Sequence, residues 1–216
     1  ITFPGYAYPN LPVADAAFRA EIEEYNATAS EPIEVVGDAK VLEFAPLDES
    51  WFMEGDYNDL DAIVGFCAGT MFIYPAMKSA MANGLCAADT KLITSGLETN
   101  ADIIADIGGD GVVQYIDVSP IENIAWSIVL LDNALQGAQY ADFSADCIDS
   151  SRYVIDSKED IDNVMSKSLN GTADPSKAQI SFEDLQTVLT RFDPDATYAQ
   201  LNELFHSDKI LVDALK

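Results

Sequence analysis

Basic residues are scarce in this sequence: 11 Lys and Arg stand against 37 Asp and Glu, which gives a formal net charge of −26. Nucleic acids and anionic lipid surfaces attract proteins mainly through clustered Lys and Arg side chains. The 216 residues contain no such cluster. The charge therefore disfavours nucleic-acid or membrane-surface binding as the main activity and predicts a strongly acidic, solvated surface.

Metal-binding residues are also few. The chain has one histidine and three cysteines, none of them in a Cys-x-x-Cys pair, so a zinc site is not expected. The acidic segments that begin at Asp174 and Asp193 lack the Gly and Glu that an EF-hand loop needs at its sixth and twelfth positions. We expect no metal and no other cofactor.

Signs of a catalytic centre are missing as well. His206 lies beside Ser207 and Asp208, but the G-x-S-x-G turn that activates a serine nucleophile is absent. The glycines at 108–111 precede an apolar strand pattern, so they cannot aim a helix N-terminus at a phosphate. We therefore expect no catalytic residues and no enzyme. A small α/β hydrolase is the alternative, and loss of turnover in Asp117→Asn or Glu98→Gln would support it.

Apolar runs are too short to span a membrane, and they instead follow a strand–loop–helix rhythm. Each of four short apolar segments leads into a loop marked by Gly, Ser or Pro and then into a helical pattern. The segments are Ile1–Phe3, Leu60–Phe66, Lys91–Thr94 and Val112–Val118. This alternation predicts an α/β fold, with an open, mostly parallel sheet between two layers of helices.

Further elements follow from hydrophobic periodicity. An amphipathic helix is predicted at 13–26, with its apolar stripe at Val13, Ala17, Phe18, Ile22 and Tyr25. Strands are predicted at 33–36 and 152–155, and a short helix within 46–59. Other helices are predicted at 71–82, with a kink or late start at Pro75, and at 121–135, 156–169, 182–191 and 198–205. We expect an α/β ligand-binding lobe at 1–137, a returning segment at 138–169 and a helical C-terminal extension at 170–216.

The loops after the four strands are the place to look for function, because ligands of open α/β sheets bind at the carboxyl ends of the strands. These loops combine aromatic faces with hydroxyl and carboxyl groups, which suits a polar ligand that also has apolar faces, such as a sugar or a nucleoside. The alternative is that the aromatic residues only pack helices on the sheet. The predicted ligand-binding residues are Tyr6, Tyr8, Phe66, Cys67, Thr70, Gly96, Glu98, Asp117 and Ser119.

The order and spacing of Leu60–Gly84, Lys91–Glu98 and Val112–Gly137 resemble the second lobe of type I periplasmic binding proteins. The opening ITFPGYAYPNLPVADAAF is similar to the first strand, loop and helix of that lobe, and RYVIDSKEDIDNVM resembles the segment that returns near its end. Members of this family bind sugars for ABC transporters and share their fold with the effector domains of LacI-type repressors.

The resemblance implies a non-enzymatic solute-binding component of an ABC uptake system, in which two lobes close on a small ligand. It implies an ABC permease as partner and an extracytoplasmic location, in the periplasm or lipid-anchored at the cell surface. Because the chain begins within a strand, we expect this segment to supply one wall of the cleft and a preceding lobe to supply the other.

Some family positions carry different residues here. Cys67-Ala68-Gly69-Thr70 stands where sugar-binding members have Asn-Asp, and Ser95-Gly96-Leu97 stands where they have Gly-Phe-Asp. Asp117 is the nearest counterpart of their third polar residue. The Ala-Gly-Thr loop is similar to that of nucleoside-binding lipoproteins of the same superfamily. These lipoproteins and a LacI-type effector domain are the alternatives within the resemblance.

Overall fold

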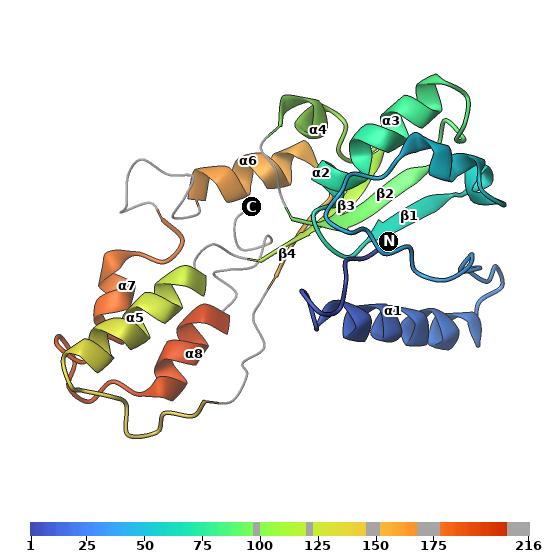
Figure 1. Ribbon diagram of the computed structural model, residues 1–216. Coiled ribbons are helices and arrows are strands. Elements are labelled where there is room, and N and C mark those ends of the chain that lie inside the picture. Colours follow the sequence, from blue (N-terminus) through green and yellow to red (C-terminus); the bar gives the residue numbers. More distant parts are fainter. Residues whose placement is uncertain (97–99, 120–122, 146–151, 168–177, 207–216) are drawn as a thin grey trace. The chain divides into compact units, whose positions relative to one another are not determined.

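The computed structural model describes residues 1–96, 100–119, 123–145, 152–167 and 178–206, and it has an α/β fold, as predicted (Figure 1). Four strands form one sheet in the order β1-β2-β3-β4. They are β1 (Ala62–Gly65), β2 (Lys91–Ser95), β3 (Val113–Val118) and β4 (Tyr153–Ile155). The chain divides into two compact units, Ile1–Ile116 and Asp117–Lys216.

The first unit repeats the predicted strand–helix alternation. β1 and β2 pair in parallel, with Ala62 opposite Lys91 and Gly65 opposite Thr94. Two helices follow β1, α2 (Gly69–Phe72) and α3 (Tyr74–Ala82), and α4 (Ala101–Ala105) follows β2. Figure 1 shows α3 and α4 on one side of these strands and α1 on the other. The helices between the strands return the chain to the end of the sheet at which the first strand began, as a parallel pair requires.

At the predicted opening strand, the backbones of Ile1 and Thr2 are hydrogen-bonded to a segment on each side. Ile1 donates to the Val64 carbonyl over 2.7 Å and accepts from Phe66 N–H over 3.1 Å. Thr2 forms a parallel bridge with Val41. Ile1 and Thr2 therefore lie between β1 and the segment at 40–42, although the run is too short to count as a strand.

The predicted first helix is present as α1 (Leu11–Asn26), but its inner face differs from the prediction. Val13 and Tyr25 are exposed, at 68% and 53%, whereas Phe18 is half-buried and packs edge-on against Phe66 at 5.8 Å. The inward face of the helix includes Leu11, Phe18 and Ile22.

The strand predicted at 33–36 is wrong. The Asn26 side chain accepts from Ile33 N–H over 2.7 Å and donates to its carbonyl over 2.8 Å. The N–H and the carbonyl of Ile33 are therefore both hydrogen-bonded to a side chain. Neither group is left to pair with a neighbouring strand.

The acidic stretch before β1 folds around its aromatic residues. It contains two short 3₁₀ helices, η1 (Glu49–Met53) and η2 (Tyr57–Asp59), where one short helix was predicted. Trp51 stacks on Tyr57 with ring centroids 4.4 Å apart, and Phe52 is fully buried. Aromatic burial therefore explains the apolar residues in this acidic segment.

The predicted break at Pro75 is confirmed. α2 ends before Ile73 and α3 starts at Tyr74, which puts Pro75 in the first turn of α3, where its missing N–H costs no intrahelical bond. Gly84, with φ of +67°, follows the end of α3 in the left-handed conformation that commonly ends helices.

The second unit contains α5 (Asn123–Leu135), α6 (Lys158–Lys167), α7 (Phe182–Gln186) and α8 (Tyr198–His206). We assigned the helix predicted at 121–135 to the lobe at 1–137, but the buried residues of α5, Ala125 and Val129, belong to one core with residues of the predicted C-terminal extension, among them Leu201 and Phe205. Asn133 strengthens this packing, because its Oδ1 accepts from the N–H and hydroxyl of Thr190.

α7 is shorter than the helix predicted at 182–191. Ser181 and Asp184 form a reciprocal capping box that starts it. The Thr187 hydroxyl then donates to the Asp184 carbonyl over 2.7 Å, and the backbone continues as turns.

A close contact joins the loop after β1 to β2. The Thr94 hydroxyl donates to the Gly65 carbonyl over 3.0 Å and accepts from Gly69 N–H over 2.8 Å. A Cβ on Gly69 would collide with Thr94 Oγ1 and lie 2.8 Å from Thr94 Cβ. A side chain at position 69 therefore has no room beside Thr94.

Gly69→Ala should lower the free energy of unfolding by about 1–3 kcal/mol, because the added methyl overpacks a buried contact. Thr94→Ala should also destabilise, by about 1–2 kcal/mol, because it leaves buried Gly69 N–H without its acceptor. In the double variant the collision with Oγ1 is gone and the 2.8 Å approach of the two Cβ atoms remains, so the loss should be smaller than the sum of the two. Urea unfolding of all four proteins measures this coupling, and strictly additive losses would contradict the contact.

Candidate functional site

The loops after β1 and β2 are joined by side-chain hydrogen bonds. Ser95 Oγ donates to the Phe66 carbonyl over 3.0 Å, and the buried Thr70 hydroxyl donates to the Gly96 carbonyl over 3.4 Å. Gly96 has φ of +88°, a conformation that favours glycine. Three predicted site residues, Phe66, Thr70 and Gly96, therefore belong to one connected wall at the carboxyl ends of the parallel strands.

The two predicted tyrosines lie in the loop after Phe3. Tyr6 is 79% exposed, and its hydroxyl donates to Glu43 over 2.8 Å, a bond that raises the Tyr6 pKa. Tyr8 packs on Phe3 with centroids 6.0 Å apart, and Phe3 in turn meets Phe72 of α2 at 5.0 Å. Phe3 thus links the tyrosine loop to α2.

Cys67 follows Phe66 in the β1 loop. It is a half-buried free thiol, and burial raises its pKa. The thiol form is favoured at neutral pH, so this cysteine offers the site a weakly polar, apolar-like surface.

Asp117 and Ser119 lie in the second unit, and the structure gives them a partner that the sequence did not reveal. Arg152 Nε donates to both carboxylate oxygens of Asp117, over 2.6 and 2.7 Å, and Nη1 donates to Ser119 Oγ over 2.8 Å. The arginine therefore neutralises the predicted carboxylate. Glu98 lies outside the described residues.

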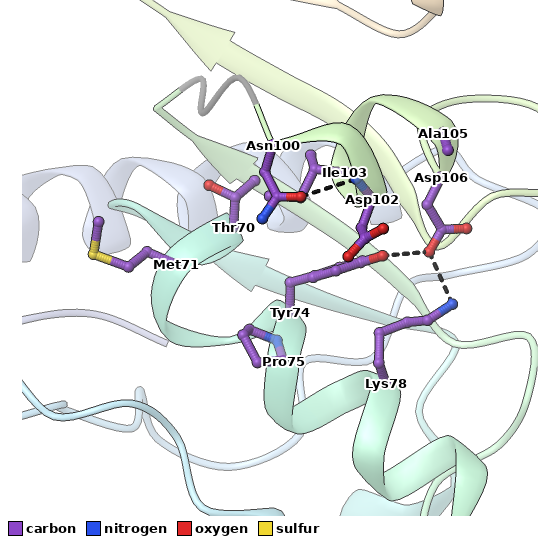
Figure 2. Close-up of a pocket in the computed structure, with 10 residues that line it drawn as sticks. All are labelled: Thr70, Met71, Tyr74, Pro75, Lys78, Asn100, Asp102, Ile103, Ala105 and Asp106. Carbon is purple, nitrogen blue, oxygen red and sulfur yellow. Dashed lines mark hydrogen bonds and ion pairs between the residues drawn. The ribbon is translucent and has the colours of Figure 1, made fainter.

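A pocket of about 660 Å³ opens in the first unit between α2 and α3 on one side and α4 on the other (Figure 2). Thr70 is the predicted site residue that lines it. Other lining residues were not predicted, among them Met71, Tyr74, Lys78, Asn100, Asp102 and Asp106.

Asp106 anchors one end of this pocket. Its Oδ2 accepts from the Tyr74 hydroxyl and from Lys78 Nζ, each over 2.9 Å, and its Oδ1 accepts from Val112 N–H over 3.2 Å. Burial alone would raise the Asp106 pKa, but the donors outweigh it, and the net pKa lies below the ordinary value. Burial and the hydrogen bond to Asp106 raise the pKa of Tyr74, so this tyrosine stays protonated.

Sequence spacing predicts only part of the contact among Tyr74, Lys78 and Asp106. Tyr74 and Lys78 are four residues apart, and such residues share one face of a helix. Their common acceptor, Asp106, lies 28 residues beyond Lys78. No local pattern joins them, because the contact arises only when α3 and the end of α4 pack side by side.

Within the residues that the structure describes, no helix is long and apolar enough to cross a membrane. The same part of the chain contains no group of three or more His, Cys, Asp or Glu side chains arranged to hold a metal ion.

Comparison with known proteins gives no match to a family model, to a curated protein or to a solved structure. The resemblance to periplasmic binding proteins therefore stays a prediction.

The Asp106 network makes a prediction about pH. Asp106→Asn should lower the free energy of unfolding near neutral pH by about 1–2 kcal/mol, because Lys78 and Tyr74 lose a charged acceptor. A lowered native pKa means that the wild-type advantage is present above the unfolded-state pKa, about 4, and is lost as pH falls through the native value. Urea unfolding at several pH values should show the two proteins converging in acid.

Asp102→Asn is the matched control, since it removes the same charge from the same pocket. Asp102 is exposed and accepts no hydrogen bond from Lys78 or Tyr74. Its stability should stay close to wild type at every pH, and an equal loss in both variants would contradict the role of the Asp106 network.

Proposed function

We propose that this chain is the ligand-binding part of an extracytoplasmic solute-binding protein that delivers a small polar ligand, a sugar or a nucleoside, to an ABC permease. The open three-layer lobe of that family belongs to the same proposal. In it, the loops at the carboxyl ends of the strands form one wall of a cleft, and the protein acts by binding and closure without chemistry.

The observation that carries the proposal is the meeting of three loops at one sheet edge of the first unit. Ile1 and Thr2 are hydrogen-bonded beside β1, so the loop with Tyr6 and Tyr8 leaves the sheet on the same side as the β1 loop. The β1 and β2 loops are tied by the Ser95–Phe66 and Thr70–Gly96 bonds. A wall held in this way needs little reordering when a ligand arrives, which favours affinity.

The exposed groups on this wall support a ligand with both polar and apolar faces. Tyr6 offers a free ring face, Phe66 and Cys67 are half-buried, and Tyr8 is 41% exposed. Aromatic rings pack on the apolar faces of sugars and bases, while hydroxyl groups such as that of Tyr6 bind their polar edges.

A thermal-shift panel of sugars and nucleosides on the full-length protein tests the proposal. A ligand that binds the folded state must raise the melting temperature, by several degrees when it is present at about 100 times its dissociation constant. If no member of the panel raises it, the proposal fails.

Tyr6→Ala should then weaken binding of the stabilising ligand about tenfold, because the stacking face is lost. Tyr25→Ala is the matched control: Tyr25 is also exposed, at 53%, and lies on α1, outside the predicted wall. Isothermal titration compares the two variants, and equal affinities would remove Tyr6 from the site.

A further inference from the structure

The pocket between α3 and α4, called the groove below, contains charged side chains that take no part in the proposed sugar or nucleoside site. It contains one cation, Lys78, and two carboxylates, Asp102 and Asp106. Lys78 is already bound to Asp106 over 2.9 Å, and Tyr74 and Val112 supply two more donors to that carboxylate. Asp106 and Lys78 therefore neutralise each other and have little capacity left for a ligand.

Asp102 is different. It lies in the first turn of α4 and lines the same groove, and no basic side chain among the described residues forms an ion pair with it. Figure 2 shows its carboxylate beside the Tyr74 side chain, while the neighbouring Asn100 side chain caps α4 by accepting from Asp102 N–H over 2.9 Å. The groove as a whole thus keeps one uncompensated negative charge.

The other walls are suited to the body of an organic cation. Met71, which is 52% exposed, and Pro75 are apolar residues of its lining. The Tyr74 ring lies across the groove, and Lys78 Nζ is already 5.9 Å from its centroid, a distance at which an ammonium group is attracted by an aromatic face. The volume of about 660 Å³ is in the range of small-molecule sites.

We propose that this groove is a second binding site, which takes a small organic ammonium ion. The positive group lies against the Asp102 carboxylate, and the apolar body packs on Tyr74, Pro75 and Met71. The Lys78–Asp106 pair, which is neutral overall, holds Tyr74 in place through the hydrogen bond from the Tyr74 hydroxyl to Asp106. This site is independent of the proposed sugar or nucleoside function, and among the described residues it shares Thr70 with the predicted ligand-binding set.

The test uses three probes of similar shape and different charge: phenethylammonium, 2-phenylethanol and phenylacetate. Isothermal titration or ligand-observed NMR on the whole chain should show phenethylammonium binding about tenfold more tightly than the alcohol, with phenylacetate weakest. Binding should weaken as salt is added, because the groove is open to solvent. Equal binding of the amine and the alcohol, or no binding of the amine at millimolar concentration, would overturn the proposal.

Two variants decide whether Asp102 makes the contact. Asp102→Asn should reduce the affinity for phenethylammonium about tenfold, and its circular dichroism and urea midpoint show that it is folded. Asp110→Asn removes the same charge from an exposed position outside the groove and should leave the affinity unchanged. Equal losses in both variants would mean that the amine is attracted only by the overall charge of −26.

Discussion

The contact of Thr94 with Gly65 and Gly69 is the constraint on which the first unit depends. One buried hydroxyl serves both the carbonyl of β1 and the first N–H of α2, so strand register and helix start are set together. Because residue 69 is a glycine, the Thr94 side chain fits against it and α2 can lie close to β2. The neighbouring bond from Thr70 to Gly96 extends this connection into the candidate wall.

In each of the two units a basic side chain binds one carboxylate. Asp106 accepts from Lys78 and Tyr74 of α3, and Asp117 accepts from Arg152 Nε at both of its oxygens. In a chain with far more acids than bases, each base that is used in this way neutralises one carboxylate and leaves others uncompensated. Asp102 is such a carboxylate, and it differs from its neighbour Asp106 only in what packs around it.

How much of this was predictable differs from element to element. β1, β2 and the break before Pro75 follow from short-range patterns, because apolar runs and proline act within a few residues. The strand predicted at 33–36 failed because the Asn26 side chain, seven residues away, occupies the Ile33 backbone. Hydrophobic periodicity does not reveal a side-chain hydrogen bond that competes with strand pairing.

The sequence by itself determined the α/β alternation, the acidic surface and the loops in which a ligand is expected, since these depend on composition and local order. Only the tertiary structure decided that Tyr74, Lys78 and Asp106 meet, that Arg152 covers Asp117, and that α5 packs with the C-terminal helices. The physical reason is that hydrogen bonds and apolar contacts are made between neighbours in space. Residues 28 or 35 positions apart become neighbours only through packing of the elements that carry them.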